Sequence, residues 1–161
     1  MKRLNIFVDE TGEFGFGNGA SELYGVSFTF HEQNDDIMPE LDKLNDRLER
    51  IGYTDMIHMT DLIMKRGEYS RFPIDKRKSI FNAIYQFSRK IPVKYKTIII
   101  DKKYTDNGRI LRQRLSIEIN NMVKEYEKYF SKFDIIIIHY YNIKLTKIFF
   151  IFFNHIINFY R

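Results

Sequence analysis

Residues 4–12 read LNIFVDETG, and the first strand of the predicted sheet lies in this stretch. Its apolar, β-branched and aromatic run over residues 4–8 predicts a strand. The run ends at Asp9 and Glu10, so the strand would deliver two carboxylates to its own C-terminal edge. Ligands and catalytic groups in open α/β sheets often lie at such edges. Asp9 and Glu10 are therefore the first candidates for a functional site.

The rest of the chain alternates between strand and helix patterns. Strands are predicted over residues 23–30, 93–100 and 133–141, and helices over residues 35–51, 74–91 and 106–130, where apolar residues recur every three or four positions. Residues 57–62 fit either a strand end or a short helix. The pattern predicts one α/β domain over residues 1–161, with a mixed sheet flanked by helices.

Composition narrows the function classes. The chain has 161 residues, no cysteine and a formal net charge of +5. The lack of cysteine excludes a disulfide framework, a thiolate metal site and a cysteine nucleophile. The longest apolar run, residues 148–153, is far shorter than the ~20 residues that span a bilayer. We expect a cytoplasmic protein without a membrane partner, whose mild positive charge would help to attract a polyanion.

Four further residues are candidates for acid–base or metal chemistry. Glu118 lies about 20° from Leu111 in helical projection, so we expect it on the core-facing side of its helix, or at a boundary where its carboxylate reaches water. Asp101 ends a strand and is either a ligand or a turn-forming cap. His58, close to Asp61, is either an acid–base group or a core histidine with a hydrogen-bond partner. Mg²⁺ and Mn²⁺ are the ions that favour such oxygen ligands.

Basic residues follow the third predicted strand. Their functional interpretation is contact with nucleic-acid phosphates, and their structural alternative is an ordinary solvated helix face. The residues concerned are Lys102, Lys103, Arg109 and Arg112.

The motif Val8-Asp9-Glu10-Thr11-Gly12 resembles the Asp-Glu-Ser-Gly opening of the bacterial domain-of-unknown-function 3800 family. The order of three further segments supports the resemblance over residues 1–141: Leu-Tyr-Gly-Val at 23–26, Ile-His-Met-Thr-Asp at 57–61, and a late strand ending in Tyr140-Tyr141. The resemblance implies an RNase H-like fold and a Mg²⁺- or Mn²⁺-dependent nuclease linked to phage defence or mobile elements. It makes Asp9 the first metal ligand, with Glu10 beside it as a catalytic residue and Glu118 as a further catalytic ligand.

The chain departs from the family pattern at its end. Asn142 follows Tyr141 where the family has an aspartate, and the later family helix that carries another aspartate has no counterpart. We therefore expect a truncated domain that lacks its last sheet elements, with an atypical apolar tail over residues 142–161. Exposed side chains of the tail would favour self-association. Two functions stay open: a metal-dependent nuclease, either active or inactivated by the truncation, and a non-catalytic nucleic-acid-binding or interaction domain.

Overall fold

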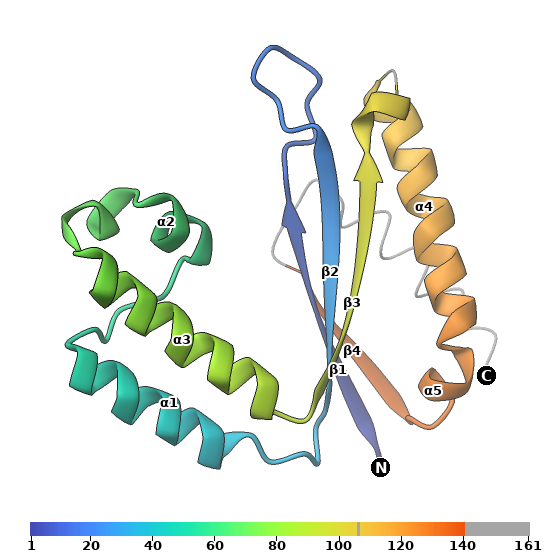
Figure 1. The fold of residues 1–161 in the computed structure, drawn as a ribbon. Coiled ribbons are helices and arrows are strands. Elements are labelled where there is room, and N and C mark those ends of the chain that lie inside the picture. The colour runs from blue at the N-terminus through green and yellow to red at the C-terminus, as the bar shows by residue number, and fades with distance from the viewer. Residues whose placement is uncertain (106, 141–161) are drawn as a thin grey trace. The chain divides into compact units, whose positions relative to one another are not determined.

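The computed structural model describes residues 1–105 and 107–140 (Figure 1). Contacts divide the chain into two compact units, one formed by residues 1–34 with the chain from residue 93 onward, the other by residues 35–92. We call them the sheet unit and the helical unit and describe each by itself. The prediction of a single domain stays a prediction, and the predicted apolar tail with its self-association lies outside the described residues.

The sheet unit is built on four strands, β1 (Arg3–Thr11), β2 (Leu23–Glu32), β3 (Val93–Asp101) and β4 (Ile135–Tyr140). Their order is β3-β2-β1-β4. β2 pairs antiparallel with both β1 and β3, whereas β4 pairs parallel with β1. The strands β1, β3 and β4 therefore all run in one direction. The predicted α/β class with a mixed sheet is confirmed.

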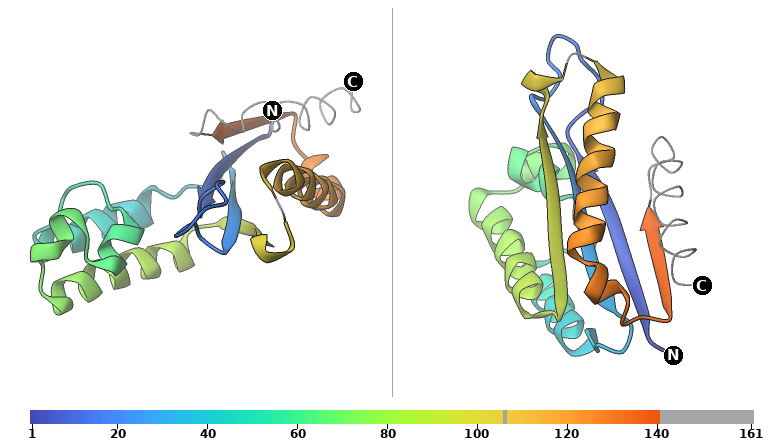
Figure 2. Two further views of the ribbon diagram at one scale, coloured as in Figure 1. Left: turned by 90° about the horizontal axis from the view of Figure 1, so that it is seen from above. Right: turned by 90° about the vertical axis from the view of Figure 1, so that its right-hand side faces the viewer.

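One face of this sheet is covered by the helix α4 (Gly108–Glu125), which follows the 3-10 turn η2 (Lys102–Tyr104) (Figure 2). Asn107 starts α4, because its side-chain oxygen accepts hydrogen bonds from the backbone N–H groups of Arg109 and Ile110. The helix predicted over residues 106–130 is interrupted at Tyr126, and the short helix α5 (Glu127–Phe130) follows. The buried core joins α4 to alternate residues of the strands: Leu4, Ile6, Val8, Tyr24, Val26, Phe28, Phe30, Leu111, Leu115, Ile119 and Met122.

The helical unit contains α1 (Met38–Ile51), α2 (Met59–Met64), the 3-10 turn η1 (Gly67–Arg71) and α3 (Ile74–Lys90). The ambiguous segment at 57–62 is thus largely helical. Gly52 ends α1 in the left-handed region, with φ of 70°, as expected for a residue without a Cβ. Tyr53, Leu62, Tyr69 and Ile80 form a second buried cluster with residues of α1. No helix in residues 1–105 and 107–140 is long and apolar enough to cross a membrane.

Gly12, directly after the acidic end of β1, is required by backbone geometry. Its φ is +83°, and an added Cβ would lie 2.3 Å from the backbone oxygen of Leu23. We expect Gly12→Ala to lower the free energy of unfolding by about 2 kcal/mol, measured by urea denaturation. The control is Gly17→Ala, because an added Cβ there meets no atom within 4 Å. Equal stabilities of the two variants would contradict this account.

Candidate functional site

The acidic end of β1 does not present its two carboxylates together. The strand continues through Thr11 instead of ending at Val8, and successive side chains of a strand point to opposite faces of the sheet. Glu10 shares the α4-covered face with buried Val8, while Asp9 lies exposed on the other face, as does Phe7. The expectation of a carboxylate pair at one shared site is therefore wrong.

Glu10 is held by two phenols. The hydroxyl of Tyr24 donates to its Oε2 at 2.5 Å, and the hydroxyl of Tyr140 donates to its Oε1. Burial, together with the hydrogen bond to Glu10 and its charge, raises the pKa of Tyr24 well above its usual range. The Tyr24 phenol therefore stays protonated and remains a donor. Both oxygens of Glu10 accept hydrogen bonds from these phenols. This carboxylate therefore connects β1 to β2 and β4 and is not free to bind a ligand.

Asp9 has a carboxylate oxygen to spare. Its Oδ1 accepts a hydrogen bond from the backbone N–H of Glu10 at 2.9 Å, and within the described part of the chain Oδ2 has no hydrogen-bond partner. The residue opposite Asp9 on β2 is Ser27. Mg²⁺ in phosphate-processing sites is commonly bound by one or two carboxylates, several waters and substrate phosphates. Asp9 could supply the single carboxylate that is the minimum for such a site.

Asp101 lies at the end of β3 and acts as a cap. Its Oδ1 accepts a hydrogen bond from the backbone N–H of Lys103 at 2.8 Å, which starts η2. Asp101 pairs with Leu23, whereas Asp9 pairs with Ser27. The two aspartates are thus two strands and four residues apart, roughly 16 Å from usual strand spacings. A single cation cannot be bound by both.

Glu118 is exposed, so the core-facing alternative is wrong, and its carboxylate reaches water as the boundary alternative expected. The buried stripe of α4, formed by Leu111, Leu115, Ile119 and Met122, is centred close to Leu115, and Glu118 lies about 55° to one side of that centre. It lines a groove between α4 and β3 together with Lys96, Arg114 and Glu125. Asp101 lines the same groove, but Asp9 and Glu10 do not. Glu118 is therefore not gathered with Asp9.

His58 and Asp61 belong to the helical unit. His58 precedes α2 and is exposed, and its backbone N–H donates to the Tyr69 hydroxyl at 3.1 Å. It is therefore not a core histidine. Asp61 lies in the first turn of α2. Over residues 1–105 and 107–140, no three or more His, Asp or Glu side chains gather as a metal site.

The predicted basic cluster divides in two. Lys102 is 7% exposed, and its ammonium donates to the backbone oxygens of Glu13 and Gly15. This lysine therefore holds the loop between β1 and β2 in place, and its ammonium is not available to a phosphate. The guanidinium of Arg112 lies 5.5 Å from the centre of the Phe14 ring. Lys103, Arg109 and Arg112 are exposed and remain available to a ligand.

Sequence reasoning missed the two phenols that engage Glu10. Tyr24 and Tyr140 are 14 and 130 residues away from it, so only the strand register brings them together. A usable signal was the parity of β1: Glu10 follows Leu4, Ile6 and Val8 at even spacing, which places it on the buried face.

Comparisons with models of protein families, with curated proteins and with solved structures find no match to this chain. The resemblance to the domain-of-unknown-function 3800 family therefore stays a prediction.

Proposed function

We propose that this protein acts on nucleic acid as a divalent-metal-dependent phosphodiester hydrolase of the RNase H-like kind. The observation that carries the proposal is the position of Asp9. It lies near the carboxyl end of a central strand, beside the parallel strand β4, with one oxygen unengaged in the described part of the chain. The resemblance to the domain-of-unknown-function 3800 family adds a bacterial cytoplasmic setting and a link to phage defence or mobile elements to the proposal.

In this proposal the carboxylates near the end of β1 have different roles. Asp9 would hold the cation on the exposed face of the sheet. Mg²⁺ or Mn²⁺ bound there would supply an activated water and stabilise the negative charge that develops on the phosphate. Glu10 is a positioning residue, because its bonds to Tyr24 and Tyr140 fix β1 relative to its two neighbouring strands.

A second candidate is a nucleic-acid-binding domain without catalysis. The engagement of Glu10 by two phenols favours it, since Asp9 is then the one carboxylate of this strand end that is left for a cation.

We expect Asp9→Ala to abolish Mn²⁺-dependent cleavage of labelled DNA or RNA, because the cation loses its anchoring carboxylate. The assay follows fragments on a denaturing gel in Mn²⁺, in Mg²⁺ and in EDTA. Asp42→Ala is the control, since it removes an equally charged, exposed carboxylate that belongs to α1 of the helical unit.

Two outcomes decide between the candidates. Equal cleavage by the wild type and Asp9→Ala would exclude Asp9 as the cation-holding residue. Binding of nucleic acid without cleavage in either metal would replace the hydrolase by the binding domain.

A further inference from the structure

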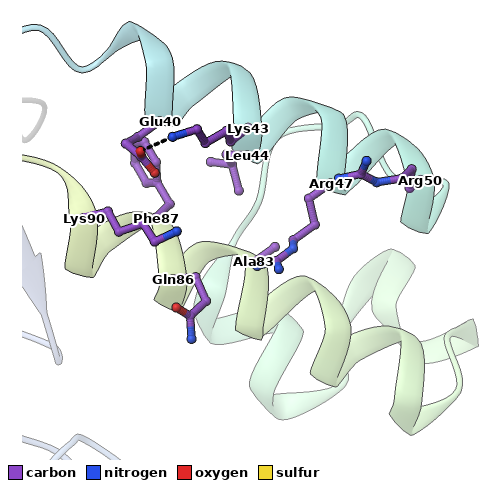
Figure 3. A pocket seen from close by; sticks show the side chains of 9 residues that line it. All are labelled: Glu40, Lys43, Leu44, Arg47, Arg50, Ala83, Gln86, Phe87 and Lys90. Carbon is purple, nitrogen blue, oxygen red and sulfur yellow. Dashed lines mark hydrogen bonds and ion pairs between the residues drawn. The ribbon is translucent and has the colours of Figure 1, made fainter.

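The helical unit contains a groove between α1 and α3 whose charged lining is mostly cationic (Figure 3). Lys43, Arg47 and Arg50 line it from α1, and Lys90 lines it from the end of α3. Glu40 is the carboxylate of this lining, which leaves a net charge of +3. The groove has a volume of about 240 Å³ and adjoins a shallower hollow of about 700 Å³ that shares both arginines. Its surface thus has the charge that an anionic ligand requires.

The charges of α1 are sorted by helical position. Lys43, Arg47 and Arg50 fall within about 60° of one another in helical projection. The acidic residues Asp42, Asp46 and Glu49 occupy the neighbouring stripe, away from the groove lining. Opposite charges three or four residues apart can pair along a helix, but among the residues that the structure describes Asp46 forms no ion pair with Lys43 or Arg50, and Lys43 pairs with Glu40 instead. The result is a cationic stripe beside α3.

The two arginines at the centre of the stripe are not neutralised by the protein. Within residues 1–105 and 107–140, neither Arg47 nor Arg50 makes an ion pair or a side-chain hydrogen bond. Figure 3 shows Arg47 extending from α1 toward α3. At one end of the groove, Lys43 donates to Glu40 at 2.5 Å, and this hydrogen bond is the main cause that lowers the pKa of Glu40. The pair cancels one cation and leaves the arginines unchanged.

The opposite wall, on α3, supplies neutral hydrogen-bond groups. Gln86 lines both the groove and the adjoining hollow, and Ser79 and Asn82 line the hollow at helical spacing from it. Ala83 and Phe87 of α3 add apolar surface to the groove. Hydroxyl and amide side chains are common partners of phosphate and sugar oxygens in nucleic-acid complexes. Arginine binds phosphate with two parallel hydrogen bonds, which favours it over lysine for planar recognition.

We propose that the groove between α1 and α3 binds the phosphodiester backbone of a nucleic-acid strand. From Lys43 to Arg50 the stripe rises about 10 Å along α1, which is long enough to contact more than one phosphate of a strand. The site extends the proposed function and rests on it, since it would hold the same class of substrate. It contains neither Asp9 nor any metal, so it is tested without divalent cations.

The test measures binding of the full chain to a fluorescent single-stranded oligonucleotide in EDTA, by anisotropy over a range of salt concentrations. We expect Arg47→Gln/Arg50→Gln to weaken binding about tenfold or more at low salt, because two phosphate contacts are lost. The slope of log affinity against log salt should fall in magnitude by about 1.4. The matched control is Arg66→Gln/Arg71→Gln, which makes the same charge change at exposed positions that do not line the groove.

Further arms keep the proposal falsifiable. Asn82→Ala/Gln86→Ala leaves the charge unchanged and should weaken binding with an unaltered salt slope, so it serves even if the arginine variant unfolds. If the two double arginine variants weaken oligonucleotide binding equally, the effect comes from the net charge of the protein and not from the groove, and the proposed site is wrong. No wild-type binding at low salt, or equally tight binding of polyglutamate, would also overturn it. Binding without Mn²⁺-dependent cleavage would leave the groove standing and remove only the hydrolase proposal.

Discussion

Glu10→Ala is expected to lower the free energy of unfolding by about 3 kcal/mol, because it removes a charged acceptor from two phenols at once. Tyr24 is fully buried, and among the residues that the structure describes its hydroxyl bonds to Glu10, so it would lose a hydrogen bond to a charged group. Tyr140 would lose its bond from β4 to β1. Urea denaturation followed by circular dichroism measures the change.

The neighbouring carboxylate provides the control. Asp9→Ala removes an exposed side chain that accepts a hydrogen bond from the backbone N–H of Glu10. We expect this variant to change the free energy of unfolding by less than about 0.5 kcal/mol. In a Tyr24→Phe background, Glu10→Ala should cost less than it does alone, since no Tyr24 hydroxyl is left without its partner. Similar losses for Glu10→Ala and Asp9→Ala would show that the phenols do not anchor the strand end.

Phe30→Ala is expected to be more destabilising still, with a loss of about 4 kcal/mol. The ring is 1% exposed and lies 5.3 Å from the ring of Tyr126 and 5.8 Å from that of Phe130, centre to centre. Its removal opens a cavity between β2 and the segment that joins α4 to α5. The aromatic rings on both sides of the cavity cannot collapse into it.

Phe81→Ala is the matched control for this deletion. The Phe81 ring on α3 is 40% exposed, so we expect a loss below about 1 kcal/mol and no cavity term. Differential scanning calorimetry of both variants would measure the contrast. Comparable midpoints for the two would contradict the assignment of Phe30 to the core.

The elements were largely predictable because their signals are local. Apolar periodicity placed three helices and four strands close to where they lie. The exact residue at which a strand ends, which decides on which face a candidate side chain lies, was harder to predict. Three more residues of strand after Val8 place Asp9 and Glu10 on opposite faces. Three consecutive polar residues at a strand end carry little sequence signal for that extension.

The candidate site depended on contacts between distant segments, which one sequence does not reveal. Lys102 seemed to be a surface cation, yet backbone oxygens of Glu13 and Gly15 engage it. Glu118 lies just outside the buried stripe of α4, because about 55° of helical projection separates it from the centre of that stripe. The cationic stripe at Lys43, Arg47 and Arg50 was accessible from helical spacing alone, but its opposite wall on α3 was not, because helix pairing is set by tertiary packing.

The register of β2 and β3 has a consequence for how this chain can vary. His31 pairs directly with Val93, so the backbone leaves the sheet and returns to it at neighbouring positions. A hairpin turn of two to five residues is enough to close such a gap. The helical unit, residues 35–92, is an insert between these points, and its replacement or deletion would leave the hydrogen-bonding ladder of the sheet intact, because Glu32, which pairs with Leu4, stays in place.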